Sequence, residues 1–377
     1  MNESNPTPEP SGEQGQAKRY ARLKLSLSLT ETSLSLAAIL ILLLTPLSRQ
    51  LADWVQTVTA SGALQWLLFF GVIGAFFSLL GMIFGFVSGY VLEHRYGLST
   101  QSIGGWLADQ GKGMALGIAF GIPALLGFRW LLLNAGVYWG LATGVTAFLV
   151  TIVLARVTPT LLLPIFFKFK PVERTDLVDD LREICERGGL ALEGVYQFDM
   201  SRQTKKANAA FTGFGTTKRI ILGDTLLEKF PVEEIRAVVA HEVGHYARGH
   251  ILKGMALSGV TLVLFFMAAQ AVYGWLAPLL GYGPAGDLAG LPLIFLLLSI
   301  AGFLFQPVSN AISRMFEREA DLYAFRDIGP RPMAGALRRL AEQNMAELQP
   351  HPVVEFFFHS HPAIAKRVAA AEAYTAS

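Results

Sequence analysis

Three long stretches of the chain contain no charged residue, and they constrain its fold more than any other feature. They run from Trp54 to Leu92, from Gly254 to Gly286 and from Leu288 to Ser313. A bilayer-spanning helix needs about 20 mostly apolar residues, and each stretch is longer than that. Charged residues make up 16% of the chain, whereas a typical soluble domain has about 25%. The sequence therefore predicts a membrane protein; the alternative for some of these runs is a core helix of a soluble protein.

The hydropathy pattern predicts six transmembrane helices. Lys and Arg residues gather before the first, between the second and third, after the fourth and after the sixth, and the opposite loops hold few. Because cytoplasmic loops carry an excess of these residues, we expect both termini on the cytoplasmic side. The expected location is the inner or plasma membrane. The expected spans lie near residues 33–54, 63–92, 113–133, 136–158, 255–280 and 289–309.

The remaining segments set the expected domain organisation. The first 30 residues are polar and rich in Pro, Ser and Gly, which predicts a disordered tail. The net charge of +2 gives no reason to expect a nucleic-acid partner, and the single cysteine, Cys185, cannot form an internal disulfide. The expected parts are a tail at 1–30, a membrane domain of four helices at 31–167, a cytoplasmic segment at 168–254, two membrane helices at 255–312 and a C-terminal segment at 313–377.

The soluble segments contain a helical and a strand-like part. "PVERTDLVDDLREICERGGL" predicts an amphipathic helix that ends at Gly188. "EGVYQFDM" and "KRIILGD" predict strands, and "ANAAFTGFG" between them predicts an extended stretch. Pro231 then opens a helix predicted to run to His250. The expected fold class is therefore mainly α, with a small β-sheet in the soluble part.

The motif "HEVGH" at 241–245 predicts a metal site. His241 and His245 are four residues apart and share one face of a helix, so they can bind one zinc ion. Glu242 stands beside the first ligand, where a carboxylate can take a proton from an activated water molecule. The alternative is a buried polar cluster with no metal.

A catalytic zinc site usually has a third protein ligand. His250 does not fit the HExxHxxGxxH pattern, because it comes one residue too early, and we expect it to be hydrogen-bonded near the membrane surface or solvated. The segment "SRMFEREAD" offers Glu317 as the third ligand. Asp321, four residues later, can orient a ligand imidazole. Glu319 falls on nearly the opposite face, where a solvated charge is expected. A surface helix with mixed charges is the alternative for this segment.

These motifs together resemble the type I CAAX prenyl proteases, a family of zinc-dependent membrane endopeptidases. "EHRYGLSTQS", "NAAFTGFGTTKRIILGDTLLE", "HEVGH", "SRMFEREAD" and "HSHPAIAKRV" carry the resemblance. The resemblance implies a helical barrel around an intramembrane chamber. This chain differs from the eukaryotic members in one respect, because they have an additional N-terminal span. By position, the resemblance implies zinc ligation by His241, His245 and Glu317, a catalytic base in Glu242, a ligand-orienting role for Asp321, substrate binding by Asn208 and carbonyl stabilisation by His361.

The sequence and the resemblance together predict a polytopic membrane protein with a cytoplasmic, gluzincin-like zinc protease domain. We expect one Zn²⁺ per chain, and as partners the lipid bilayer and peptide or protein substrates, including lipid-modified or membrane-embedded ones. One alternative is an HtpX-like quality-control protease of membrane proteins. Another is a non-proteolytic zinc-binding scaffold or transporter, although the chain shows no internal repeat and lacks none of the residues that catalysis needs.

Overall fold

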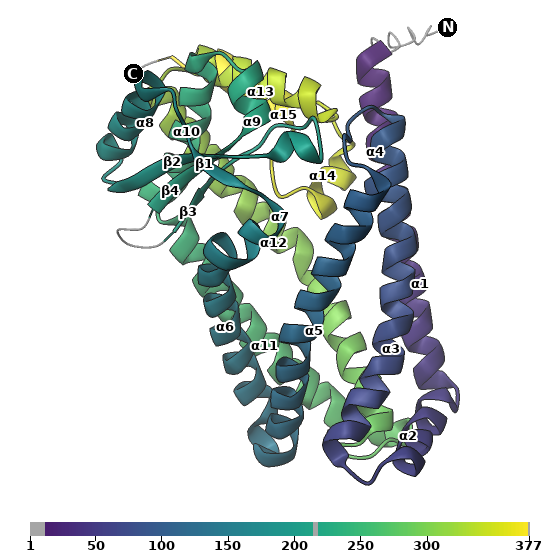
Figure 1. The fold of residues 1–377 in the computed structure, drawn as a ribbon. Coiled ribbons are helices and arrows are strands. Elements are labelled where there is room, and N and C mark those ends of the chain that lie inside the picture. Colours follow the sequence, from purple (N-terminus) through teal and green to yellow (C-terminus); the bar gives the residue numbers. More distant parts are fainter. Residues whose placement is uncertain (1–11, 214–217, 376–377) are drawn as a thin grey trace, which may run out of the picture.

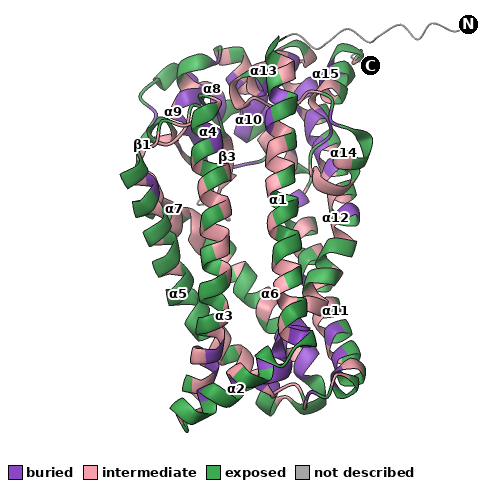
Figure 2. Cartoon of the chain, turned by 90° about the vertical axis from the view of Figure 1, so that its right-hand side faces the viewer, coloured by how far each residue is buried: buried purple, intermediate pink, exposed green. Residues whose placement is uncertain are grey.

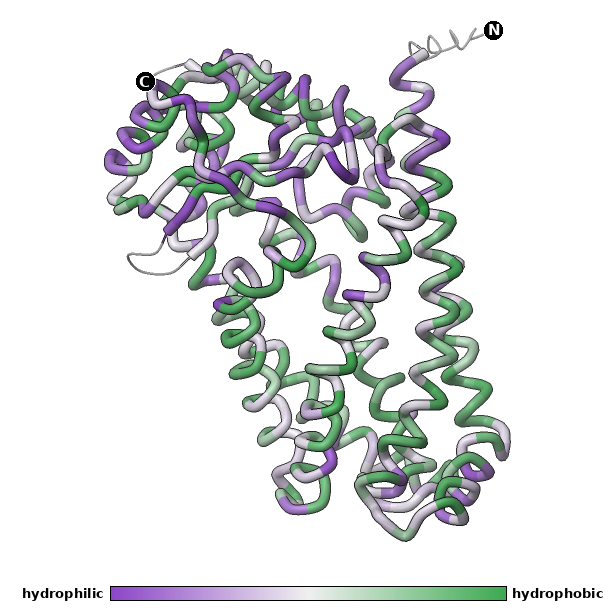
Figure 3. The backbone as a smooth tube through the Cα atoms, in the orientation of Figure 1, coloured by the Kyte–Doolittle hydropathy of each residue, from purple (hydrophilic) through white to green (hydrophobic). Residues whose placement is uncertain are grey.

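The computed structural model describes residues 12–213 and 218–375, and its larger part is a bundle of long helices (Figure 1). Six helices in the described residues are long and apolar enough to cross a membrane, which confirms the predicted number. Figure 3 shows that apolar residues dominate them, whereas hydrophilic residues concentrate in the unit at one end. The six are α1 (Gly12–Leu44), α3 to α4 (Gly62–Arg95, with η1 at Phe86–Val91 between them), α5 (Ile103–Asn134), α6 to α7 (Trp139–Phe166, with η3 at Thr158–Leu162), α11 (His250–Leu279) and α12 (Leu291–Asp327).

The N-terminal region differs from the prediction in two respects. The tail expected at 1–30 is helical from Gly12 onward, and residues 1–11 lie outside the described part. The first long helix ends at Leu44, before Pro46, so the expected span at 33–54 is placed too late in the chain. Residues 47–58 form a separate short helix, α2. A proline cannot donate a backbone hydrogen bond within a helix, which explains the break.

Glu93 explains why the polar start of α1 is ordered. This buried carboxylate accepts a hydrogen bond from Tyr20 at 2.5 Å and lies 2.6 Å from Lys24 Nζ, and both partners belong to α1. It also lies 2.9 Å from Lys206 Nζ, just before strand β3 (Ala209–Thr212). A buried charge is stable only when it is paired and hydrogen-bonded, so this cluster joins α1, α4 and the β3 region at one place.

The far end of the bundle is closed by α2 and by the loop between α11 and α12. The Ser48 hydroxyl donates to the carbonyl of Ala289 at 2.6 Å, and the Tyr282 hydroxyl donates to the carbonyl of Leu43 at 2.7 Å. A second hydrophobic cluster lies here, separate from the core at the other end, as the two groups of buried residues in Figure 2 show.

The unit at the other end, which we call the head, contains the sheet. Its strands are β1 (Phe169–Pro171), β2 (Leu192–Phe198), β3 (Ala209–Thr212) and β4 (Lys218–Gly223), in the spatial order β1-β2-β4-β3. β2 and β4 are parallel, and the other two pairs are antiparallel. Its helices are α8 (Thr175–Arg187), α9 (Asp224–Lys229), α10 (Val232–Ala247), α13 (Pro330–Asn344), α14 (Pro352–Phe358) and α15 (Ile364–Glu372).

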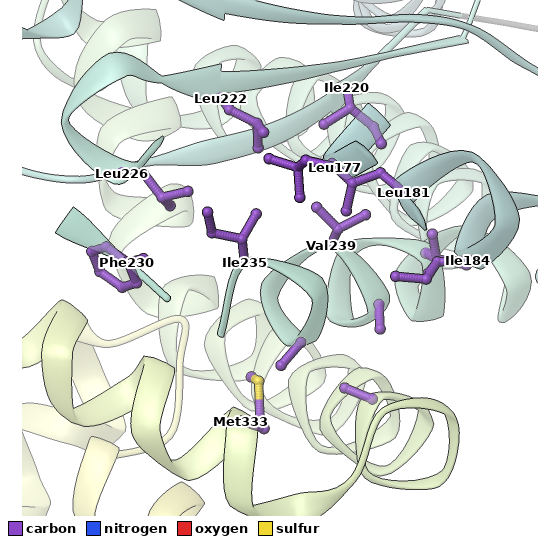
Figure 4. Close-up of a cluster of buried hydrophobic side chains, with 14 of the residues drawn as sticks. Leu177, Leu181, Ile184, Ile220, Leu222, Leu226, Phe230, Ile235, Val239 and Met333 are labelled. Carbon is purple, nitrogen blue, oxygen red and sulfur yellow. The ribbon is translucent and has the colours of Figure 1, made fainter. Parts of the chain in front are cut away.

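The core of the head contains the apolar face of the predicted amphipathic helix, α8. α8 and the two predicted strands, β2 and β4, are confirmed, with small shifts at their ends. Leu177 and Leu181 of α8 meet Leu222 of β4 and Ile235 and Val239 of α10 in one buried cluster (Figure 4). This core fixes α10 against the sheet. The last part of α12 packs on the same core, so one helix extends from the bundle into the head.

Glycines allow α6 and α11 to pack closely within the bundle. A Cβ at Gly144 would lie 2.7 Å from Cα of Val263, and one at Gly140 would lie 2.6 Å from the carbonyl oxygen of Phe266. Both contacts are too short for a real side-chain carbon, so only glycine permits this backbone distance. Small residues at helix contacts are the usual means of close packing in membranes.

We expect Gly144→Ala to destabilise the bundle, because its methyl group meets backbone rather than a flexible side chain. Overpacking of this kind costs about 1–3 kcal/mol. Thermal unfolding of the purified protein in detergent measures the loss. Gly274→Ala on α11 is the matched control, because nothing lies within 4 Å of a Cβ there. Equal melting temperatures for the two variants would contradict the proposed packing.

Candidate metal centre and active site

The two histidines of "HEVGH" and the acidic residues of "SRMFEREAD" meet in the head. α10 presents His241 and His245 on one face, and α12 presents Glu317 and Asp321 toward them. His241 Nε2 and His245 Nε2 lie 3.2 Å apart. Glu317 Oε1 lies 3.2 Å from His245 Nε2, and Glu317 Oε2 lies 3.4 Å from His241 Nε2. The structure thus brings together the three residues that the sequence suggested as ligands.

These distances fit a tetrahedral metal ion. Ligand atoms about 2.0–2.1 Å from a tetrahedral zinc ion stand about 3.3 Å from one another. The three observed separations are 3.2, 3.2 and 3.4 Å. Among the described residues, Glu317 Oε2 is buried without a hydrogen-bond partner. A carboxylate whose two oxygens face two imidazole nitrogens, one of these oxygens without a hydrogen-bond partner, is an arrangement that a cation satisfies.

Close packing of α10 on α12 creates this geometry. A Cβ at Gly244 would lie 3.1 Å from Cα of Ala320 and 2.9 Å from Cβ of Tyr323. The two helices therefore touch through their backbones at the glycine of "HEVGH". Gly244 follows His241 by three residues and precedes His245 by one, and Ala320 lies between Glu317 and Asp321. Any larger residue at position 244 would push the histidines of α10 away from the acidic residues of α12.

Asp321 and Arg367 fix the ring of His241. Asp321 Oδ1 lies 2.9 Å from His241 Nδ1, so this ring can donate to the carboxylate while its Nε2 faces Glu317. Arg367 of α15 donates two hydrogen bonds to Asp321, at 2.8 and 2.6 Å, and its Nη1 lies 3.4 Å from Glu317 Oε2. Sequence reasoning gave Arg367 no role at the site. A basic residue six positions after His361 was the only local signal.

The carboxylates give this centre a strong preference for positive charge. Burial alone would lower the pKa of His241, but hydrogen bonds to Asp321 and Glu317 outweigh it and raise that pKa to about 9. A proton or a metal ion can supply the positive charge that these two carboxylates stabilise. Because a ligand imidazole must be neutral, a metal ion that binds here displaces the proton.

Glu242 lies beside the histidines and is half-buried. Burial raises the pKa of its carboxyl group, and the charges of His241, His245 and Arg367 oppose that rise. A carboxylate whose pKa is moved toward neutrality by burial is suited to take up and release a proton.

His361 and Asn208 approach the centre from two other segments. His361 lies in the turn before α15, with its Nε2 3.3 Å from Glu317 Oε1 and its side chain 61% exposed. Asn208 is exposed and immediately precedes β3, and its carbonyl accepts a hydrogen bond from Gly223 at 2.9 Å. β3 contacts α10, so the strand runs beside the helix that carries the histidines. The structure brings His361 to the centre, and it places Asn208 immediately before the neighbouring strand.

His250 was expected to be hydrogen-bonded near the membrane surface or solvated, and Glu319 to be a solvated charge; the structure shows His250 hydrogen-bonded and the side chain of Glu319 37% exposed. His250 is buried, with its Nδ1 3.1 Å from His245 Nδ1 and its Nε2 3.1 Å from Glu319 Oε2. The predicted helix from Pro231 to His250 ends at Ala247, and Gly249 has a left-handed backbone with φ of 68°. This break turns His250 back toward His245, so a helical wheel drawn through 250 misplaces its ring.

Comparisons with known proteins agree with this architecture. A family model described as peptidase family M48 matches residues 171–375, and one described as the N-terminal part of CAAX prenyl proteases, with five membrane helices, matches residues 12–168. Four of the six candidate membrane helices lie within that second range. The chain is 28% identical over 335 residues to an uncharacterised metalloprotease, YhfN, of Bacillus subtilis, covering 88% of this chain and 78% of the relative.

Two further relatives point the same way. CAAX prenyl protease 1 of Saccharomyces cerevisiae is 28% identical over 326 residues, covering 81% of this chain and 72% of that protein. The crystal structure of S. mikatae Ste24p superposes with a TM-score of 0.87 at 25% sequence identity, covering 98% of this chain and 92% of that one. The M48 match alone spans more than half of the chain. The chain therefore belongs to peptidase family M48 and is a CAAX-prenyl-protease-like membrane metalloendopeptidase.

Proposed function

We propose that this metalloendopeptidase uses one zinc ion, held by His241, His245 and Glu317. The observation that carries the proposal is that the Nε2 atoms of His241 and His245 lie 3.2 Å apart and that each lies 3.2–3.4 Å from one carboxylate oxygen of Glu317. Two imidazoles and one carboxylate are a ligand set that catalytic zinc uses, and this set leaves a fourth position free. Asp321 orients His241 from outside that set.

Zinc bound there supplies a Lewis acid that polarises the scissile carbonyl and makes a water molecule more acidic. Glu242 accepts the proton of the water molecule that attacks the carbonyl carbon, and it then gives this proton to the leaving amine. The raised pKa of Glu242 favours both transfers, because the carboxyl group can hold the proton between them. His361 donates a hydrogen bond to the oxygen that becomes negative.

The substrate peptide adds to the free edge of β3. β3 is the last strand of the sheet order β1-β2-β4-β3, so its outer edge has no partner strand among the described residues. An extended peptide can pair with such an edge through main-chain hydrogen bonds, which tolerate many sequences. Asn208, at the start of this strand, is placed to contact the substrate backbone.

The membrane setting points to one class of substrate, peptides of lipid-modified or membrane-embedded proteins. The positive-inside distribution of Lys and Arg supports a cytoplasmic head, and we propose the inner or plasma membrane as its location. One named relative is a CAAX prenyl protease, and the family model that matches residues 12–168 describes the N-terminal part of such proteases, so the HtpX-like and non-proteolytic alternatives are not favoured.

Glu242→Gln tests the mechanism directly. The ligand set stays intact, so the variant is expected to retain about one zinc ion per chain while turnover falls by at least about 100-fold, since general-base catalysis contributes about 10²–10⁴. Zinc content and cleavage of a peptide substrate by the purified protein are the two measurements. Activity near that of the wild type would show that Glu242 is not the base.

Glu317→Ala tests the third ligand. Loss of one of three ligands is expected to weaken zinc binding by more than about 100-fold, beyond the range that outer partners of a metal site usually contribute. Competition with a zinc chelator measures the affinity. Glu342→Ala, at an exposed carboxylate on α13, is the matched control. If the two variants bind zinc equally well, the ligand assignment fails.

His361→Ala tests the stabilisation of the reacting carbonyl. Removal of one donor of this kind is expected to lower kcat by about 10²–10³ with zinc content and melting temperature unchanged. His359→Ala is the comparison, because among the described residues His359 is hydrogen-bonded through its backbone alone: its carbonyl accepts from Arg314 at 2.6 Å and its N–H donates to Glu355 at 3.3 Å. Equal kcat values for the two variants would leave His361 with a structural role only.

A further inference from the structure

The Nδ1 atoms of the two histidines on α10, which point away from the proposed metal position, have different partners. His241 has a carboxylate, Asp321, on its Nδ1 at 2.9 Å. His245 has no carboxylate on its Nδ1 among the described residues; instead, the Nδ1 of a third histidine, His250, lies 3.1 Å away. A ligand imidazole needs such a partner, because the hydrogen bond fixes both its tautomer and the direction of its ring.

The positions of the protons follow from the partners of each nitrogen. His245 Nε2 faces Glu317 Oε1 and His241, so a metal ligand there must present a lone pair. The proton of neutral His245 is then on Nδ1, which donates to Nδ1 of His250. His250 must accept on that nitrogen, so it carries its own proton on Nε2, which donates to Glu319 Oε2 at 3.1 Å. This arrangement gives every ring nitrogen of the pair a matching partner.

His250 is also held rigidly. It is 4% exposed, and its ring stacks on Phe316 with a centroid separation of 4.3 Å and an interplanar angle of 10°. It is the first residue of α11, directly after the left-handed Gly249. Glu319 and Phe316 both belong to α12, so one helix supplies the carboxylate and the stacking partner.

We propose that His250 and Glu319 are positioning residues for His245, a histidine–carboxylate pair that does for this ligand what Asp321 does for His241. The proposal rests on the proposed zinc site. The bond between His245 of α10 and His250, the first residue of the membrane-spanning helix α11, then has a role. The orientation of the ligand His245 depends on where α11 begins.

His250→Phe separates hydrogen bonding from packing, because phenylalanine can keep the stack on Phe316 but forms neither hydrogen bond. Zinc affinity of the purified full-length protein, measured by chelator competition, is expected to fall by about 10- to 100-fold. The visible absorption spectrum of the cobalt(II)-substituted protein is expected to change, since it reports ligand geometry. Glu319→Gln is expected to shift both readouts in the same direction by a smaller factor. His250→Asn retains an acceptor near the Nδ1 position and is expected to recover part of the affinity.

The controls distinguish the possible failures. Glu342→Gln is the matched carboxylate control and is expected to leave both readouts unchanged. Wild-type affinity and spectrum in His250→Phe, together with zinc loss in Glu317→Ala, would overturn the positioning role and leave the zinc site in place. Unchanged affinity in Glu317→Ala would overturn the zinc site itself. If His250→Phe does not fold, Glu319→Gln decides, and wild-type affinity in that variant overturns the proposal.

Discussion

The backbone contact between α10 and α12 at Gly244 and Ala320 is the constraint on which the rest of the site depends. Two helices from distant parts of the chain approach until a single added carbon would lie 2.9–3.1 Å from its neighbours. This approach places the imidazoles of one helix against the carboxylates of the other. The head core holds α10 in that position, because α10 packs on α8 and on the sheet at the same time.

The metal centre is connected to the membrane bundle by three separate routes. α12 passes through the bundle and carries Glu317 into the head, and α11 begins at His250, which contacts His245. The third route is the Glu93 cluster, which ties α1 and α4 to Lys206 beside the edge strand. A change in the arrangement of the membrane helices therefore acts on both the ligands and the proposed substrate strand.

Each charged group in the centre is stabilised by a partner from another segment. Arg367 of α15 neutralises Asp321 and lies close to Glu317, and it is itself only 10% exposed. Removing one member of such a buried network leaves its partner's charge unpaired, which is much more costly than losing the same contact at a surface. The C-terminal segment is therefore part of the site, through both Arg367 and His361.

The sequence alone determined what is local along the chain. Long uncharged runs predict membrane helices because a bilayer leaves no other means of satisfying the backbone. The spacing of His241 and His245 predicts a shared helical face because the α-helical repeat is fixed. The spacing of Glu317 and Asp321 predicts a second shared helical face. The resemblance to a family indicated that these two pairs of residues belong to one site.

Only the tertiary structure decided contacts that depend on a chain reversal or on a distant partner. The backbone break at Gly249 turns His250 toward His245, and no periodic pattern can show where a chain goes after a left-handed residue. Arg367 reaches Asp321 because α15 folds back on α12. The helix of residues 12–30 was missed because polar composition predicts disorder, whereas its buried pairing with Glu93 supplies the stability that composition does not show. Periodicity describes one element at a time, and these features are made by the packing of several.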